Sequence, residues 1–115
     1  MRINQQLNCE NTFLVEIKGL VQGVGFRPYI HRLAISNNLT GWVENRNDGV
    51  AIKITCTSEV LNQFISSIKL TSPPAAIIES IGFRQTDKEN FTDFKIVKSK
   101  TISNMITDIS PDIAV

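Results

Sequence analysis

Two segments with the period of a helix are interleaved with five segments that have the character of strands, and this order constrains the fold more than any other feature. The first helical segment repeats an apolar residue every three or four positions, at Phe26, Tyr29, Ile30, Leu33 and Ala34. The second repeats in the same way, at Val60, Leu61, Phe64, Ile65 and Ile68. Each pattern gives a helix one apolar stripe, which it must bury against another element.

The strand segments are identified by apolar residues at every second position. Residues 12–18 place three apolar side chains on one face and residues 49–56 place four, namely Phe13, Val15 and Ile17, then Val50, Ile52, Ile54 and Cys56. Residues 40–46, 77–84 and 91–99 are interpreted as three further strands, with a less regular alternation in 77–84. The chain therefore contains five expected strands.

Local signals predict where the two helices begin and end. Pro28 suits the first turn of a helix, where a backbone N–H has no partner within the helix. Asn37 and Asn38 are candidates for a left-handed residue at the end of that helix. Ser58 is predicted to cap the second helix, and the run Ser72-Pro73-Pro74 to end it.

The resulting order, β-α-β-β-α-β-β, predicts an α+β fold. We expect a ferredoxin-like (β-α-β-β-α-β plus a fifth strand) sandwich, in which an antiparallel sheet carries both helices on one face. The turn between the second and third strands contains Asp48-Gly49, a pair that favours positive φ.

The length of 115 residues allows one domain. We divide the chain into a flexible, Asn- and Gln-rich N-terminal arm at 1–11, a folded domain at 12–99 and a tail or linker at 100–115. The tail contains Ser110-Pro111-Asp112 and shows no clear period.

Composition excludes several classes of protein. The chain is 42% hydrophobic and 20% charged, with a formal net charge of +1, as expected for a globular domain without a polyanion-binding field. Two cysteines and one histidine give neither a disulfide framework nor a zinc motif. Neither a signal peptide nor a membrane-spanning segment is recognisable. We expect a cytoplasmic protein.

The run from Gly19 to Arg27, GLVQGVGFR, is the segment that most indicates chemistry. A strand, a loop with three glycines and a helix start can direct successive backbone N–H groups into one concavity that binds an anion. The alternative is a tight strand-to-helix turn without function. Arg27 favours the anion site, because its planar guanidinium can bind phosphate oxygens.

GLVQGVGFR resembles the signature of the acylphosphatase family, and Gly41-Trp42-Val43-Glu44-Asn45 resembles its second signature, G-W-V-x-N. The resemblance covers roughly residues 12–99. It implies that Arg27 binds phosphate and that Asn45 orients the nucleophilic water, both as catalytic residues. The amides expected to bind the phosphoryl group belong to Gln22, Gly23, Val24, Gly25 and Phe26.

Departures from the ordinary family pattern resemble the N-terminal domain of the hydrogenase-maturation carbamoyltransferases, the HypF type. They are Glu44, Val50 directly after Gly49, Pro28 after Arg27, the Ser72–Glu79 segment and the tail. This resemblance implies hydrolysis of carbamoyl phosphate or other acyl phosphates. It also implies hydrogenase-maturation partner proteins that act through a longer protein. No cofactor or metal is expected in this fragment, since zinc and ATP would belong to downstream domains.

Three other functions fit parts of the sequence. A stand-alone acylphosphatase shares the chemistry, but the tail and the departures disfavour it. A non-catalytic module that binds carbamoyl phosphate would have little need for Asn45. An RNA-recognition module has the same element order but needs stacking aromatics on a central strand, and residues 50–56 contain none. We therefore expect no nucleic-acid partner and no membrane partner.

Other polar and aromatic residues receive simpler interpretations. His31 is interpreted as a partly packed residue rather than a phosphate sensor, and Trp42 as a packing residue rather than a substrate platform. Lys95, Lys98 and Lys100 are interpreted as a solvated strand edge that discourages pairing with other chains.

Overall fold

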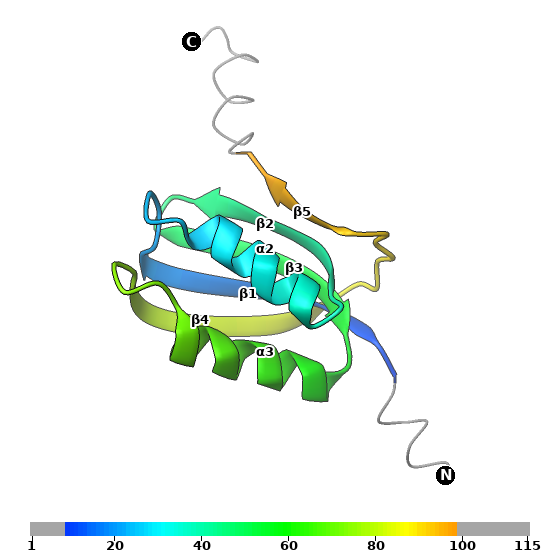
Figure 1. Ribbon diagram of the computed structural model, residues 1–115. Coiled ribbons are helices and arrows are strands. Elements are labelled where there is room, and N and C mark those ends of the chain that lie inside the picture. Colours follow the sequence, from blue (N-terminus) through cyan, green and yellow to red (C-terminus); the bar gives the residue numbers. More distant parts are fainter. Residues whose placement is uncertain (1–8, 99–115) are drawn as a thin grey trace, which may run out of the picture.

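A computed structural model of the chain describes residues 9–98 (Figure 1). Its elements, in order along the chain, are β1 (Asn11–Leu20), α2 (Phe26–Ser36), β2 (Thr40–Arg46), β3 (Gly49–Cys56), α3 (Ser58–Thr71), β4 (Ile77–Thr86) and β5 (Phe94–Val97). This order confirms the ferredoxin-like α+β fold predicted from the sequence. The predicted bounds of β2 and β3 agree with the structure, whereas β5 is shorter than the segment 91–99.

The five strands form one sheet in the order β4-β1-β3-β2-β5. β1 pairs antiparallel with β3 and β4, and β2 pairs antiparallel with β3. β5 runs parallel to β2, so the sheet is mixed and the expectation of a wholly antiparallel sheet was wrong. The reason is topological: β4 runs opposite to β1 and therefore opposite to β2, and the chain reverses direction between β4 and β5, so β5 runs parallel to the strand β2 that it joins at the far edge.

Both helices cover the same face of the sheet (Figure 1). Their apolar stripes meet the strand residues that alternate toward that face, and together they form the core. Its fully buried members include Ile30 of α2, Phe64 and Ile68 of α3, and Val15 and Ile52 of the sheet. Complete burial of one such side chain stabilises the fold by about 1.5–3 kcal/mol. The stripes read from the sequence are the surfaces that the structure buries.

The connection between β4 and β5 packs on the opposite face of the sheet through Glu89. The Glu89 backbone N–H donates to Thr12 Oγ1 at 2.8 Å, and Thr55 Oγ1 donates to the Glu89 carbonyl at 2.7 Å. The Glu89 carboxylate also pairs with Lys53 Nζ at 2.6 Å. These contacts explain how the chain crosses to the far edge while it satisfies polar groups on this face.

The helix ends differ in part from the prediction. The cap of α3 is Thr57, whose side chain accepts a hydrogen bond from the Val60 N–H, and Ser58 is the first helical residue. Both residues are hydroxyl-bearing, so only the backbone conformation decides between them. At the end of α2, Asn38 adopts a left-handed φ of 58°, as predicted for one of the two asparagines, whereas Asn37 does not.

Gly49 is required for a different reason from the one predicted. Its φ is not in the positive region; instead, a Cβ at this position would lie 1.8 Å from the Ile17 carbonyl oxygen. The turn between β2 and β3 therefore lies directly against β1, and glycine permits this approach.

The predicted N-terminal arm at 1–11 and tail at 100–115 lie mostly or wholly outside the described residues. Asn11 is an exception, since it begins β1 and so belongs to the sheet rather than to the arm. Among the described residues, no helix is long and apolar enough to span a membrane.

Substitution of the cap tests the assignment of the α3 N-terminus. Thr57→Ala should lower the free energy of unfolding by about 1 kcal/mol, because the Val60 N–H loses its acceptor. Ser58→Ala, the neighbouring control, should change it by less than about 0.5 kcal/mol. Urea denaturation measures both changes. A larger loss of unfolding free energy in Ser58→Ala than in Thr57→Ala would identify Ser58 as the cap instead.

Candidate active site

The loop between β1 and α2 is held at both ends by buried residues. Val21 and Phe26 are each 1% exposed, and between them Gln22, Gly23 and Gly25 face solvent. Gly23 and Gly25 have φ values of 76° and 77°, a conformation that other residues rarely adopt. A Cβ at either glycine would meet nothing within 4 Å, so the backbone conformation rather than crowding requires glycine here. The loop thus has an accessible backbone between two fixed ends.

The N-terminus of α2 opens onto this loop. Gly25 is the N-cap residue and supplies no side-chain hydrogen bond, and no acidic residue lies in the first turn. The first N–H groups of a helix have no intrahelical acceptor and carry the positive end of the helix dipole. Hydrogen bonding within the helix starts with Tyr29 N–H to the Gly25 carbonyl, at 3.1 Å. This terminus has the charge and the donors that an anion requires.

Arg27 is the second residue of α2 and is partly exposed. Its Nη1 donates to the carbonyl of Val97, near the end of β5, at 3.4 Å. Val97 pairs with Glu44 in the parallel β2–β5 ladder. Arg27 is therefore near the end of β2, beside the residue that precedes Asn45.

Asn45 lies near the end of β2, on the same side of the strand as Val43, which is buried beneath the helices. Its side-chain oxygen Oδ1 is buried and has no hydrogen-bond partner among residues 9–98. Buried polar atoms are nearly always hydrogen-bonded, and an orphaned one needs an explanation, such as a catalytic role or a bound water. Oδ1 is thus an acceptor that no described protein group uses.

Gln22 joins the loop to the turn that follows Asn45. Its Nε2 donates to the carbonyls of Arg46 and Gly49, the latter at 3.0 Å. The Gly19 N–H also donates to the Asp48 carbonyl of this turn, at 3.0 Å. The structure therefore brings the glycine loop to the end of β2, and Arg27 reaches the same end through β5. Figure 1 shows the loop and the β2–β3 turn at the same end of the sheet.

Glu44 points to the other side of β2, away from the helices. Its side chain is 10% exposed and its Oε2 pairs with Arg46 Nε at 2.7 Å. Because successive strand residues alternate between faces, Glu44 and Asn45 lie on opposite sides of the sheet. This ion pair stabilises the strand end but does not share the face of Asn45.

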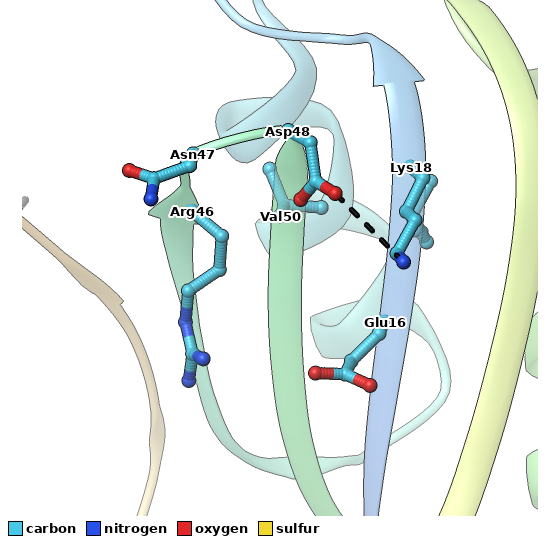
Figure 2. A pocket seen from close by; sticks show the side chains of 7 residues that line it. Glu16, Lys18, Arg46, Asn47, Asp48 and Val50 are labelled. Atoms are coloured by element: carbon cyan, nitrogen blue, oxygen red, sulfur yellow. Dashed lines mark ion pairs between the residues drawn. The ribbon is translucent and has the colours of Figure 1, made fainter.

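A cavity of about 400 Å³ lies beside the β2–β3 turn (Figure 2). It is on the sheet face opposite the helices, where Glu16, Lys18 and Arg46 project. Lys18 and Asp48 form an ion pair at 3.8 Å, with side chains 57% and 66% exposed, so the pair contributes little to stability. Neither Asn45 nor residues 22–27 line this cavity, and it is separate from the loop.

The other residues considered in the sequence are described by their packing and exposure. His31 is partly buried, with its ring centroid 5.9 Å from that of Phe94, in line with a packed residue. Trp42 is partly buried on the face opposite the helices, where it pairs in register with exposed Lys95 of the edge strand β5. Lys98 is exposed, and Lys100 lies outside the described residues.

Cys56 is not available as a nucleophile at neutral pH. It ends β3, opposite Asn11, whereas the loop lies at the end where β3 begins. Burial, together with the smaller effect of the nearby charge of Glu10, raises the pKa of the Cys56 thiol to about 11. The thiol is therefore protonated and unreactive at physiological pH.

Comparison with known proteins identifies the family. Residues 13–96 match the model of the family described as Acylphosphatase. The chain belongs to the acylphosphatase family. It is an acylphosphatase domain, similar both to stand-alone acylphosphatases and to the N-terminal part of HypF carbamoyltransferases.

The relatives fall into two groups that differ in length. The chain is 38% identical over 85 residues to the carbamoyltransferase HypF of Synechocystis, covering 74% of this chain and 11% of that protein. It is 36% identical over 84 residues to an acylphosphatase of Pseudothermotoga lettingae, covering 72% of this chain and 93% of that protein. The chain thus spans about a tenth of the carbamoyltransferases that it matches.

The similar solved structures also include both long carbamoyltransferases and short acylphosphatases. A full-length HypF in a phosphate- and nucleotide-bound form matches with a TM-score of 0.74 and 33% identity, over 80% of this chain and 13% of that chain. An acylphosphatase from Coxiella burnetii matches with a TM-score of 0.72 and 26% identity, over 80% of this chain and 96% of that chain.

Two features of the site were not predicted from the sequence. The side chain of Gln22 contacts the β2–β3 turn, although the sequence suggested only a role for its backbone amide. The backbone carbonyl of Val97 on β5 accepts a hydrogen bond from the guanidinium of Arg27. Both contacts join segments far apart in the chain, and no local sequence pattern predicts them.

Binding of inorganic phosphate tests the loop directly. In a titration followed by amide NMR, the largest shifts should occur at residues 22–26, because the accessible N–H groups and the helix dipole lie there. Arg27→Ala should weaken the affinity by roughly tenfold or more, through loss of a charged donor. Arg32→Ala, an exposed arginine of the same helix, is the control. Shifts concentrated elsewhere, with residues 22–26 unaffected, would contradict the assignment.

Proposed function

We propose that this domain hydrolyses acyl phosphates, with the glycine loop and Arg27 as the phosphate site and Asn45 as the residue that orients water. The observation that carries the proposal is that three groups lie at one end of the sheet: a helix N-terminus without a side-chain cap, an arginine beside it, and Asn45 Oδ1, which has no hydrogen-bond partner among residues 9–98. Membership of the acylphosphatase family supports it.

The phosphoryl group is held by backbone amides of Gln22 to Phe26 and by Arg27. Its negative charge persists through the transition state of phosphoryl transfer, so donors fixed in advance serve both binding and catalysis. The positive φ of Gly23 and Gly25 permits the loop conformation that exposes these amides, and the buried Val21 and Phe26 fix the two ends of the loop.

Asn45 prepares the nucleophile. Its Oδ1, to which no group of the described part of the chain donates, accepts a hydrogen bond from a water, and its amide nitrogen can donate one, so the water is aligned for attack on phosphorus. As the water oxygen bonds to phosphorus, the phosphorus–oxygen bond to the acyl oxygen breaks and a carboxylate leaves. A phosphate oxygen of the substrate takes the proton of the water, since the carboxylate is already a good leaving group and needs no proton. The domain uses no cofactor of its own in this mechanism.

We further propose that carbamoyl phosphate is the substrate and that the domain serves a HypF-type carbamoyltransferase. The similarity to HypF proteins supports this role, as do the departures at Glu44 and Pro28. Carbamate released by simple hydrolysis is unstable in water, so other domains, with their zinc and ATP, would capture the group and pass it to hydrogenase-maturation partners.

A second candidate is a stand-alone acylphosphatase. It is favoured by one observation: the chain covers about nine-tenths of the acylphosphatases that it matches, so their whole fold is present here. The chemistry of the site would be the same, and the substrate would be an acyl phosphate without a downstream acceptor.

Two substitutions test the hydrolytic site. Arg27→Ala should lower kcat/KM for acetyl phosphate and carbamoyl phosphate by roughly 100-fold or more, because the arginine acts in the ground and transition states. Asn45→Ala should lower kcat by roughly 100-fold while inhibition by inorganic phosphate changes by less than about twofold, because Asn45 contacts water.

Matched controls are Arg32→Ala and Asn62→Ala; both residues are exposed, Arg32 further along α2 than Arg27 and Asn62 on α3. They should retain full activity. Full activity in Arg27→Ala and Asn45→Ala would show that the active site is elsewhere.

The length of the natural polypeptide distinguishes the two candidate roles. An antibody against residues 13–96 should detect a protein several times longer than this chain if the domain serves a carbamoyltransferase. In that longer protein, Arg27→Ala should abolish transfer from carbamoyl phosphate to the partner, because the site supplies the carbamoyl group. Normal transfer by the variant would show that carbamoyl transfer does not need this site. Detection of only a protein of this chain's length would favour the stand-alone enzyme.

A further inference from the structure

The side chain of Gln22 spans two segments that are distant in the sequence. Gln22 lies in the glycine loop, and its Nε2 donates to the carbonyls of Arg46 and Gly49, which are 24 and 27 positions away. The two acceptors are the last residue of β2 and the first residue of β3. One amide group thus bridges both sides of the β2–β3 turn.

The nature of the acceptors determines the orientation of the amide. Both are backbone carbonyls, which only accept hydrogen bonds, so the NH₂ group must face them and both of its hydrogens are used. A carboxylate of the same length would place an oxygen against two carbonyl oxygens. The contact is therefore specific for glutamine over glutamate.

The bridged turn is fixed to the sheet independently of Gln22. Gly49 lies so close to β1 that a Cβ would come within 1.8 Å of the Ile17 carbonyl. The Asp48 carbonyl accepts from the Gly19 N–H at 3.0 Å. The turn is thus held against β1, and Gln22 attaches the exposed part of the loop to it.

Asn45 directly precedes Arg46, the first acceptor of this bridge. We propose that Gln22 is a positioning residue that sets the distance between the phosphate loop and Asn45, in addition to any contact of its backbone amide with phosphate. This inference rests on the proposed hydrolytic function and deepens it. An error of about 1 Å between a bound group and its nucleophile can cost roughly 100-fold in rate.

Kinetics of two variants test the role. Gln22→Met keeps the length of the side chain and removes both donors; its kcat should fall by roughly 10- to 100-fold, while inhibition by inorganic phosphate changes by less than about threefold. Gln22→Glu should be slower still, because its carboxylate faces two carbonyls. Gln63→Met and Gln63→Glu, at an exposed position of α3, are the controls. A rise in KM and in the inhibition constant with unchanged kcat would assign Gln22 to phosphate binding alone and overturn the proposal.

A double-mutant cycle distinguishes positioning from a general structural effect. If Gln22 acts through the alignment of Asn45, then Gln22→Met should lower kcat by less than about twofold in the Asn45→Ala background. The same fold-loss in both backgrounds would show that the two residues act independently, and the proposal would be wrong.

Amide hydrogen exchange tests the bridge without reference to activity. Exchange at residues 46–49, in the turn that Gln22 bridges, should be faster in Gln22→Met than in the wild type and in Gln63→Met. Unchanged exchange would mean that the bridge does not hold the loop, and this would overturn the inference while leaving the hydrolytic proposal intact. If exchange is faster in Gln22→Met but the wild type hydrolyses no acyl phosphate, the bridge exists and the proposed function is refuted, and with it the positioning role.

Discussion

Burial of two helical stripes against one face of the sheet is the interaction on which the rest of the structure depends. Ile30 of α2 and Phe64 and Ile68 of α3 are completely buried against that face. Because α2 is held there, the loop before it must join β1 to the first turn of the helix over a short distance. Val21 and Phe26, both in the core, fix the two ends of that loop. The core therefore determines where the candidate phosphate site can be.

The site depends on contacts between segments that are far apart in the chain. Gln22 reaches the β2–β3 turn at Arg46, and Arg27 reaches Val97, which pairs with Glu44. Asn45 is the residue between Glu44 and Arg46 on β2. In such an arrangement the sheet supplies the rigidity and the loop supplies the exposed amides. The proposed chemistry needs both, since donors must be accessible to a substrate and yet fixed before it arrives.

Particular elements show how far the sequence could be read. The alternation in residues 49–56 and the stripes of both helices were sufficient for the fold, because burial of one face imposes these periods. The family signatures were sufficient to propose Arg27 and Asn45. The cap of α3 was wrong by one residue, because Thr57 and Ser58 have the same capping chemistry and differ only in backbone conformation. The parallel direction of β5 was also missed, since strand periodicity contains no information about direction.

The sequence by itself determined the order of the elements, the surfaces that are buried and the position of the glycine loop before a helix, because these follow from side-chain period and backbone freedom along a continuous segment. Only the tertiary structure decided that Gly49 packs against Ile17, that β5 joins the far edge, and that the Gln22 side chain bridges Arg46 and Gly49. These features arise from distances between residues that are separated by tens of positions, and a local pattern cannot specify such distances.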